Sequence, residues 1–564
     1  MAAHRRLALA FLFALSLTAE DKRTVVRGGP FRVVSLSGLA PAQLALAQLE
    51  QFRYAFALFT GHKEPALVWP VTLVVFKPSR QSPSEDTSLS LARDAHFASL
   101  RERAPLPPAL LQNLATLFIG DNLKRLPPSE EQGLLATLTQ FSSEGTHITI
   151  GVPSAAARTL DWARIFRFVA DPATLGELHV FLANLENGAG MDIACRNAFR
   201  QSSTAMEAAL DAYFKAGSFS EAAISGLAIA PNRDFHGQTL DLDEEKLALA
   251  DFALATNNTA VAQSAYASLH GTEGEEGLGL MALAEGKTDD ARTHLLSAAR
   301  LNSKSARAYA ALAGLESDTK KKRMDLQQAA ALNPRWAEPL QQLALTEVNP
   351  AGAVLWLKKA VALAPRNIAY WRALAESATA AQDFPTAEKA WTGAALAAQT
   401  DAERQQLVAR RRSLEVQRTD AAEADRKREL DARAADLKRV ENLTLDSIHA
   451  AEAKANKALN ADGAAPVVNA VPYASLDGEH GPKSEGTLVR LECRASIALL
   501  VLEDASHRVS KFLVRDPTHL AVTGAASTIG CGPQTLPRHA IVEYRPKTDR
   551  RYGTVGEAQA VDFP

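Results

Sequence analysis

Histidine is the side chain that most often binds zinc or transfers protons near neutral pH, so the histidine spacing is the first indicator of chemistry in this sequence. The thirteen histidines lie far apart, and the smallest separation, twelve residues, is between His507 and His519. Zinc peptidases of the HExxH type need two imidazoles four residues apart on one helix face, with a glutamate between them as general base. The spacing excludes this motif, its inverted form and a short HxH pair. We therefore expect no metal and no other cofactor, with a metal site assembled from distant segments as the alternative.

The three cysteines are the other side chains that can do covalent chemistry. Cys493 and Cys531 fall in one small C-terminal region and are the natural disulfide pair if the chain is exported, because such pairs close in oxidising compartments. Closing a loop of this size stabilises the folded state by about 4 kcal/mol in the chain-entropy model. Cys195 is left over, and its surroundings favour a buried free thiol over a nucleophile.

The first residues have the pattern of a secretory signal. A basic segment, residues 4–6, precedes an apolar run, residues 7–17, which is followed by small residues and then by acids. The run is too short to anchor the chain across a bilayer. We therefore expect a signal peptide over residues 1–19, cleaved near Ala19, and a mature protein in the periplasm or outside the cell with no membrane span. A buried N-terminal helix is the alternative.

Residues 27–215 alternate between strand and helix patterns. Short apolar runs predict strands at 29–36, 68–76 and 146–153. Apolar residues at helical spacing predict helices at about 40–59, 107–119, 129–140, 159–169, 174–188 and 203–215. The sequence therefore predicts an α/β domain.

Several segments of this region, taken in order, resemble the gluzincin-like peptidase domain that precedes tetratricopeptide (TPR) repeats in many secreted bacterial proteins. FRVVS, LEQFRYAFALF and PVTLVVF are similar to the opening strand–helix–strand of that domain. NLKRLPPSEEQGLLA is similar to the stretch that runs from its metal-binding helix to its acidic third ligand, and TLDWARI and MEAALDAYFKAG to the helices after the site. The resemblance implies a peptidase-like fold over most of residues 27–215.

The residues that this family uses for catalysis are missing. Gln112 and Thr116 stand where the family has its two histidines, and Asn113 stands where it has its general base. Further along, Gln132 stands where the glutamate ligand would be. Neither an amide nor a hydroxyl replaces an imidazole on zinc with useful affinity, and an amide has no basic lone pair to activate water. The resemblance therefore implies an inactive peptidase-like domain.

An enzyme of another kind is the competing hypothesis. Asp121, Glu130 and Glu131 could keep a substrate in the former peptidase cleft of a hydrolase. Acids at helix starts are common, however, so paired carboxylates are weak evidence. We favour a non-enzymatic protein.

The clearest periodicity lies in residues 240–415. The TPR pattern places large residues at positions 4, 7 and 24 of a unit, small ones at 8, 20 and 27, and proline at 32. Up to five units follow it, and Pro334 and Pro365 close two of them. The packing positions hold Leu278, Gly279 and Ala291 in one unit, and Trp371, Leu374, Ala375, Ala387 and Trp391 in the last. Because small residues let helices approach and large ones fill the gaps, the pattern predicts a TPR superhelix with a concave groove.

The groove of such an array suggests a binding function. We expect Gln341, Tyr370 and Arg372 to face it, and an extended or helical segment of a protein partner to bind there. The alternative is an array that only spaces its flanking domains. The formal net charge of -2 gives no argument for a nucleic-acid partner.

The segment after the repeats contains neither glycine nor proline until residue 463. Residues 416–460 mix acids and bases almost evenly and predict a charged linker helix. Leu430, Ala434 and Leu437 give only a thin apolar stripe, so a coiled-coil dimer is a minor alternative.

The last two regions are a linker and a small domain. Residues 461–486 are rich in glycine, proline and alanine and predict a flexible linker. Residues 487–564 contain short alternating runs separated by turn signals, which predict five or six strands in a small barrel or sandwich. The sequence thus predicts a multidomain, mainly α protein with an N-terminal α/β domain and a C-terminal all-β domain.

Overall fold

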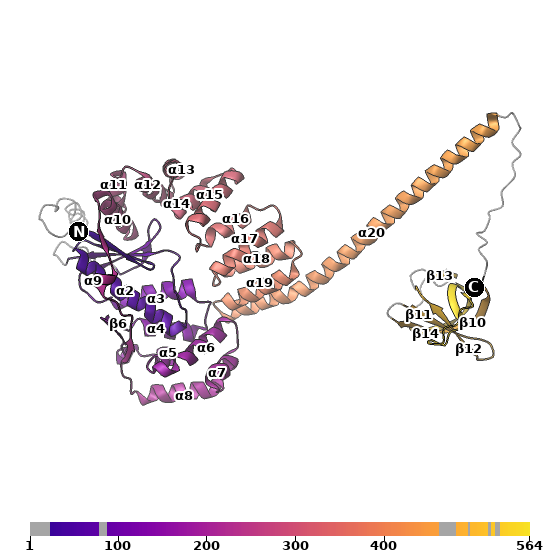
Figure 1. The fold of residues 1–564 in the computed structure, drawn as a ribbon, viewed down its shortest axis with the longest axis horizontal. Coiled ribbons are helices and arrows are strands. Elements are labelled where there is room, and N and C mark those ends of the chain that lie inside the picture. Colours follow the sequence, from indigo (N-terminus) through magenta and orange to yellow (C-terminus); the bar gives the residue numbers. More distant parts are fainter. Residues whose placement is uncertain (1–22, 78–86, 462–480, 495–496, 517–519, 525–530) are drawn as a thin grey trace. The chain divides into compact units, whose positions relative to one another are not determined.

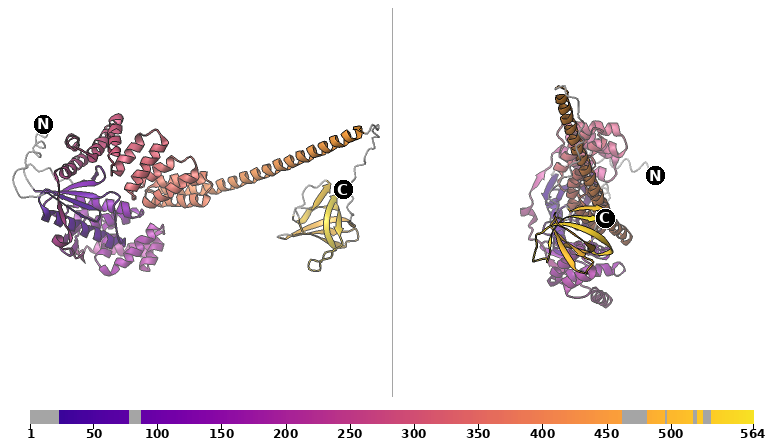
Figure 2. Two further views of the ribbon diagram at one scale, coloured as in Figure 1. Left: turned by 45° about the horizontal axis from the view of Figure 1, so that its top comes forward. Right: turned by 90° about the vertical axis from the view of Figure 1, so that its right-hand side faces the viewer.

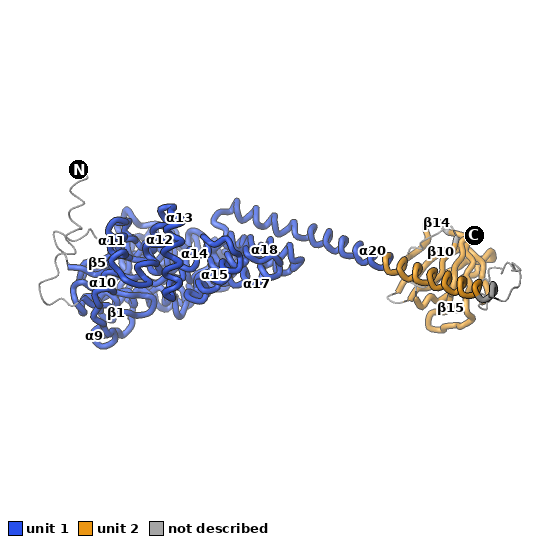
Figure 3. Tube along the Cα trace, turned by 90° about the horizontal axis from the view of Figure 1, so that it is seen from above, with its two compact units in different colours: residues 1–434 blue, residues 435–564 orange. Residues whose placement is uncertain are grey.

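The computed structural model describes residues 23–77, 87–461, 481–494, 497–516, 520–524 and 531–564. The expected signal peptide and most of the expected linker lie outside these residues. The chain divides into two compact units, residues 1–434 and residues 435–564, which Figure 3 colours separately. The first unit holds an α/β domain and a helical array, and the second holds a β domain.

A six-stranded sheet organises the α/β domain (Figure 1). Its strands are β1 (Thr24–Gly28), β2 (Phe31–Ser35), β3 (Val71–Phe76), β4 (Ser90–Leu91), β5 (His96–Arg101) and β9 (Gly237–Thr239), in the order β4-β5-β3-β2-β1-β9. The pairs β2–β3 and β3–β5 are parallel, and the other pairs are antiparallel. All six residues of β3 are buried, as expected for a central parallel strand covered on both faces. The expected domain boundaries, 27 and 215, are too narrow, because β9 returns to pair with β1.

The main hydrophobic core lies between this sheet and five helices of the α/β domain. These are α2 (Leu39–Thr60), α3 (Pro108–Asn122), α4 (Pro128–Leu138), α5 (Leu160–Val169) and α6 (Leu175–Glu186). Helix α2 connects the parallel strands β2 and β3, and its Phe52 and Phe56 are fully buried against Phe118 of α3. The sequence predicted each of these helices to within a few residues, because each has an apolar face at helical spacing.

A second, antiparallel sheet completes the domain. It contains β6 (Phe141–Glu144), β7 (His147–Ile150) and β8 (Ala222–Ser225), and the remaining helices are η2 (Ala155–Ala157), η3 (Pro172–Thr174), α7 (Met191–Phe199), α8 (Ser203–Ala216) and α9 (Pro231–Asp234). Cys195 lies on α7 as a buried free thiol. Burial, with Glu130 and Glu207 nearby, raises the pKa of this thiol, so Cys195 is not activated as a nucleophile.

The helical array consists of ten helices in the described range 242–397, and Figure 2 shows them stacked in sequence order. They are α10 (Leu242–Ala255), α11 (Thr259–Ala267), α12 (Thr272–Ala284), α13 (Thr288–Arg300), α14 (Ala306–Leu315), α15 (Thr319–Leu332), α16 (Glu338–Leu345), α17 (Pro350–Leu363), α18 (Ile368–Ala380) and α19 (Phe384–Ala397). Consecutive helices pack on each other as five hairpins, one for each unit expected from the TPR spacing.

Small side chains let these helices pack closely. Most residues at the expected packing positions are buried: Gly279, Ala291, Leu374, Ala375, Ala387 and Trp391. A Cβ on Gly279 would lie 2.7 Å from Cγ of Leu295, so only glycine fits there without a shift. Leu278 and Trp371 are only half-buried. The Trp371 ring covers Gly393, and its indole N–H donates to the carbonyl oxygen of Pro365 at 2.8 Å.

Helix α20 (Asp401–Ala461) is a single helix of 61 residues. The expected boundary between residues 415 and 416 therefore falls inside it. Leu407 and Leu414 are buried against the last hairpin, whereas Leu430 and Leu437 are 59% and 72% exposed. None of the helices in the described parts of the chain has the length and apolar character needed to cross a membrane.

The β domain is a small barrel. Its strands are β10 (Lys483–Arg494), β11 (Ile497–Glu503), β12 (Val509–Val514), β13 (Ala521–Gly524), β14 (Gly532–Arg545) and β15 (Gly556–Phe563), in the order β12-β11-β10-β14-β15-β13, and β12 also pairs with β15. That extra pairing closes the sheet around a core that includes Leu500, Phe512 and Val542. Residues 483–486 belong to β10, so the flexible linker ends earlier than the sequence suggested.

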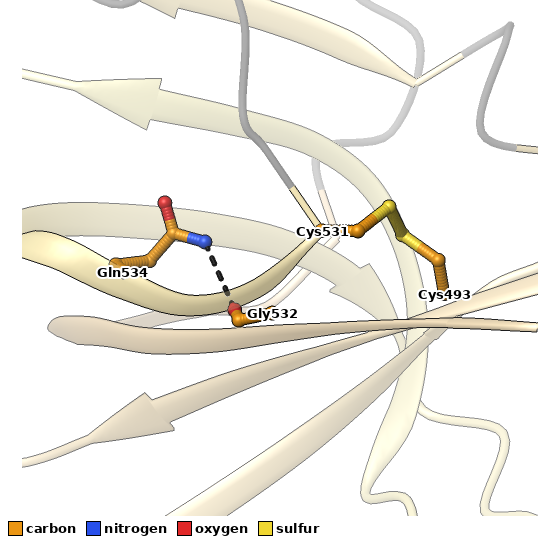
Figure 4. The surroundings of a disulfide bond; sticks show 4 residues. All are labelled: Cys493, Cys531, Gly532 and Gln534. Carbon is orange, nitrogen blue, oxygen red and sulfur yellow. Dashed lines mark hydrogen bonds between the residues drawn. A yellow bond between two sulfur atoms is a disulfide. The ribbon is translucent and has the colours of Figure 1, made fainter.

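A disulfide joins Cys493, near the end of β10, to Cys531, just before β14 (Figure 4). The two Cα atoms are 5.7 Å apart. Next to it, Nε2 of Gln534 donates to the carbonyl oxygen of Gly532 at 3.2 Å. The bond thus joins the end of β10 to the start of β14, which pair in the sheet.

Candidate binding site between the α/β domain and the helical array

The first two hairpins of the array are held to the α/β domain by a buried ion cluster. Arg93, in the turn between β4 and β5, binds Asp251 of α10 (Nε–Oδ1 3.2 Å) and Glu276 of α12. Both carboxylates are almost fully buried, and each has a second partner: Tyr266 donates to Asp251 and Ser303 donates to Glu276, both at 2.6 Å. Burial by itself would lower the pKa of Arg93, but the two carboxylates outweigh burial and raise the pKa. Arg93 is therefore charged, and each of the two carboxylates has two hydrogen-bond partners.

The third hairpin uses the same turn. The carboxylate of Asp94 accepts from the backbone N–H of Arg307 at 3.1 Å, at the start of α14. The Arg307 guanidinium in turn donates to the carbonyl oxygen of Ala92. Three consecutive hairpins thus bind the same short turn, the one between β4 and β5.

The last two hairpins contact a different part of the domain. Asn333 donates to the carbonyl oxygen of Val68 at 2.9 Å, and the Trp69 and Trp336 rings meet edge to face with centroids 5.0 Å apart. Arg366 pairs with Glu131 of α4. Arg125 donates to the carbonyl oxygen of Ala397, at the end of α19, at 3.1 Å. All five hairpins therefore contact the α/β domain, so part of the array's surface is already covered within the chain.

A cavity of about 610 Å³ lies between these contacts, where α3 ends and where α16 and α18 begin. Its wall includes Val68, Gly120 and Asp121 from the α/β domain, and Arg335, Trp336, Glu338, Arg366, Asn367, Tyr370 and Gln399 from the array. We call it the seam cavity. It combines two guanidinium groups, two aromatic rings and two carboxylates.

The polar groups of the seam cavity are not all paired. Nη1 of Arg366 is buried and makes no hydrogen bond. Asp121 accepts from the backbone N–H of Val68 at 2.8 Å, while burial raises the pKa of this carboxyl. Burial, with Glu338 nearby, also raises the pKa of Tyr370. Among the described residues this buried donor has no acceptor, which is a cost to the folded state.

Two further cavities border the end of the array. One, of about 470 Å³, is lined by Trp371, Pro365 and Leu396 with Lys124, Arg125 and Lys389 at its rim. The other, of about 490 Å³, lies where α18 and α19 meet α20 and includes Arg372, Glu376, Trp391 and Arg410.

The three residues expected to face one groove do not line one common cavity among the three described here. Tyr370 lines the seam cavity, and Arg372 lines the cavity beside α20. Gln341 is half-buried on α16 and lines none of these three cavities. Tyr370 and Arg372 are two positions apart on α18, so their side chains leave the helix about 200° apart and meet different neighbours.

The four residues that the peptidase resemblance aligned with metal-site positions lie on α3 and α4. Gln112 and Thr116 are exposed on α3, and the amide of Asn113 donates to the carbonyl oxygen of Thr87 at 2.9 Å. Gln132 is exposed on α4. Within the described residues, no group of three His, Cys, Asp or Glu side chains could hold a metal ion. Gln112, Thr116 and Gly120 follow at four-residue steps, so this face of α3 leads to the seam cavity.

The three acids of the competing enzyme hypothesis have separate roles. Glu130 is fully buried beside Arg164, and burial raises its pKa. Glu131 is paired with Arg366, and only Asp121 lines the seam cavity. The structure does not bring them together as a substrate site.

Arg335, Trp336 and Arg366 were missed by the sequence reasoning. A signal for two of them was present: each of the prolines that close a unit, Pro334 and Pro365, is followed by arginine. The repeat of this Pro-Arg pair places one guanidinium before α16 and one before α18, on the same side of the array.

No protein-family model matches the sequence, and no curated protein is similar to it. Among solved structures, MamA is 20% identical (TM-score 0.23) and covers 28% of this chain and 89% of its own. PilF of Pseudomonas aeruginosa is 17% identical (TM-score 0.27; 32% and 87% covered), and YrrB, described as a TPR protein with an unusual peptide-binding site, is 13% identical (TM-score 0.25; 28% and 89% covered). TM-scores this low carry no argument, so the repeat architecture rests on the helix hairpins and their packing.

Proposed function

We propose that this protein is a non-catalytic scaffold that binds a segment of a partner protein in the seam cavity. The observation that carries the proposal is the cavity wall, in which Trp336 and Tyr370 lie beside the guanidinium groups of Arg335 and Arg366. Tryptophan, tyrosine and arginine are the side chains that contribute most to the binding energy of protein interfaces. The cavity is large enough for a few side chains of a peptide rather than a whole domain.

The exposed guanidinium of Arg335 in the cavity wall suggests how the segment is oriented. A backbone carbonyl or carboxylate of the peptide would accept from Arg335, while an apolar side chain would contact Trp336 and Tyr370. This arrangement needs both the α/β domain and the array, and it is the reason to place binding at their boundary rather than on the array alone.

The peptidase-like resemblance supports the same site. The α3 face that carries Gln112 and Thr116 continues to Gly120 in the cavity wall. We therefore propose a peptidase-like domain that keeps a peptide-binding cleft but lacks the groups for hydrolysis. The signal-like N-terminus favours the periplasm or the outside of the cell as the place where it acts.

The test uses a photo-crosslinking amino acid placed at position 370 or 372 of the full-length protein. The proposal expects one partner to crosslink from position 370, which lines the seam cavity, and not from position 372, which lines another cavity. With that partner purified, Tyr370→Ala combined with Arg335→Glu should weaken binding at least about thirtyfold, as for two hot-spot residues. Arg372→Glu is the matched control and should leave the affinity within twofold.

Crosslinking from position 372 alone would show that the partner does not bind in the seam cavity. An equal loss of affinity in the Tyr370→Ala, Arg335→Glu variant and in Arg372→Glu would show the same.

A separate measurement tests whether the protein is non-catalytic. Purified protein should contain no stoichiometric zinc and should cleave no peptide, and one zinc per chain with chelator-sensitive proteolysis would overturn it.

A further inference from the structure

The end of β14 and the loop that connects it to β15 carry four positive side chains. Arg545, Lys547, Arg550 and Arg551 are all exposed within seven residues, and we call them the basic loop. In the part of the chain that the structure describes, none of these four side chains forms an ion pair. By contrast, the neighbouring Arg515 pairs with Glu557 at 3.1 Å.

The basic loop is held in a defined shape. The Asp549 carboxylate accepts from the backbone N–H of Arg551 at 2.9 Å, and the buried Thr554 hydroxyl accepts from the backbone N–H of Asp549 at 3.2 Å. The backbone N–H of Thr554 in turn donates to the carbonyl oxygen of Asp549. Gly553 completes the turn with φ +65°, a conformation that other residues adopt rarely. The turn therefore fixes where Arg550 and Arg551 leave the backbone.

A fifth cation joins the group from another strand. Arg494, at the end of β10, has its guanidinium 5.6 Å from the Tyr552 ring centroid, and Arg551 has its own 5.5 Å from the same centroid. The disulfide of the preceding residue, Cys493, holds this end of β10 against the start of β14. Two guanidinium groups are thus gathered around one half-buried ring.

Arg494 also pairs with Glu492 at 3.9 Å, but the four cations of the basic loop have no such partner among the described residues. Like charges without partners destabilise a folded domain, so they need a reason outside the fold. A guanidinium binds carboxylates through two parallel N–H donors, and four of the five cations are arginine. We propose that the basic loop and Arg494 form a docking surface for an acidic, carboxylate-rich segment of a partner protein. This surface lies in the β domain and is independent of the seam cavity.

Two other polyanions fit the same observations less well. Single-stranded nucleic acid binds by stacking bases on free aromatic faces, but the Tyr552 ring already has two guanidinium groups against it. An anionic lipid surface attracts diffuse clusters of basic residues and does not require a fixed loop shape. A protein segment with several carboxylates therefore fits this surface better than a nucleic acid or a lipid surface does.

The test measures binding of a fluorescein-labelled deca-glutamate peptide to the full-length protein by fluorescence anisotropy. We expect saturable binding that weakens as salt rises from 50 to 150 mM, since the attraction is between exposed charges. The triple variant Lys547→Glu, Arg550→Glu and Arg551→Glu should bind at least about tenfold more weakly. The triple variant Arg426→Glu, Lys427→Glu and Arg428→Glu on α20 changes the net charge equally and should stay within twofold.

Folding is checked separately, so that a damaged β domain is not mistaken for lost binding. The single changes Lys547→Gln and Arg550→Gln, at exposed positions, should each weaken binding about threefold while the β domain melts at the wild-type temperature. Equal loss in both triple variants, or no binding of deca-glutamate above a neutral peptide, would overturn the proposal. So would tighter, loop-dependent binding of phosphatidylglycerol vesicles or of a single-stranded oligonucleotide.

Discussion

The array and helix α20 are both alanine-rich and helical, yet different interactions stabilise them. Array helices are 8 to 14 residues long, and alanines such as Ala291 and Ala375 are fully buried between them. Helix α20 has 61 residues, and from residue 415 to residue 457 its side chains are exposed apart from a half-buried Ala421. There it carries ion pairs one turn apart, such as Arg433 with Glu429.

The contrast predicts how far the loss of stability caused by a substitution extends in each region. A helix as short as α16 is marginal alone, so its stability comes from its neighbours, and damage should spread across the array and the α/β domain. A long exposed helix is held by its own backbone hydrogen bonds and by weak local pairs, so damage should stay local.

The largest expected effect is at the buried ion cluster. Arg93→Met leaves Asp251 and Glu276 buried without their cation and should cost about 3–5 kcal/mol of unfolding free energy for the first unit. The control Arg433→Met removes an exposed pair of α20 and should leave that unfolding unchanged. Urea denaturation measures both variants. Equal losses of unfolding free energy would show that the two regions do not differ in how they are stabilised.

This variant should also respond to pH in a defined direction. Burial, partly offset by Arg93, already raises the pKa of Glu276, so the folded state binds its proton more tightly than the unfolded state. Stability from the protonated form is present at low pH and is lost as the pH rises through the raised pKa. The loss caused by Arg93→Met should therefore be smaller at pH 5 than at pH 8.

A second comparison removes a large side chain from each region. Trp391 is 7% exposed between the last hairpin and α20, so Trp391→Ala should cost about 3–5 kcal/mol. Leu437 is 72% exposed, and Leu437→Ala should change the unfolding free energy by less than about 0.5 kcal/mol. Thermal melting of the two variants checks this, and a cost at Leu437 close to that at Trp391 would mean that α20 has a packed partner.

A third comparison exchanges glycine and alanine. Gly279→Ala adds a methyl that would lie 2.7 Å from Leu295, so it should destabilise the array by about 1–3 kcal/mol although alanine favours helices. Ala434→Gly should lower the helix content of α20 by circular dichroism and leave the melting of the array unchanged. A stabilising Gly279→Ala would contradict the close packing of α12 on α13.

The smallest expected effect concerns Asp325 of α15. Burial, with Glu316 nearby, raises its pKa to about 6, so the stability linked to its protonated form is lost as the pH rises through 6. Asp325→Asn should therefore stabilise the array at pH 8 by less than about 1 kcal/mol, because the group is partly solvated, and should have no such effect at pH 4. Lys321→Met removes a cation that opposes the shift and should enlarge the pH dependence of melting. A melting difference independent of pH would contradict this assignment.

Local periodicity was enough to predict most elements. The helix expected over 40–59 is α2, and the strand expected over 68–76 is β3. These segments bury one face or the whole strand, so their apolar spacing reports their structure directly. The short strand β9 has only exposed residues and no such spacing, which is why the domain boundary at 215 was misplaced.

The site was predicted less well than the fold. Tyr370, Arg372 and Gln341 were expected to face one groove, but Tyr370 and Arg372 line different cavities and Gln341 lines neither of these. The docking of the array depends on Arg93, which looks like an ordinary loop cation in the sequence and finds Asp251 158 residues away. Single-sequence patterns report neighbours along the chain, not partners at that distance.

The pairing of β1 with β9 limits the order in which parts of the chain can fold during synthesis. Strand β1 is the first described strand, yet its outer edge stays open until residues 237–239 have been made. The contact between Arg125 and Ala397 spans 272 residues, so the array closes onto the sheet later still. Contacts of such high sequence separation form slowly and leave apolar edges exposed meanwhile. A nascent chain of this protein should therefore depend on chaperones until its last hairpin has emerged.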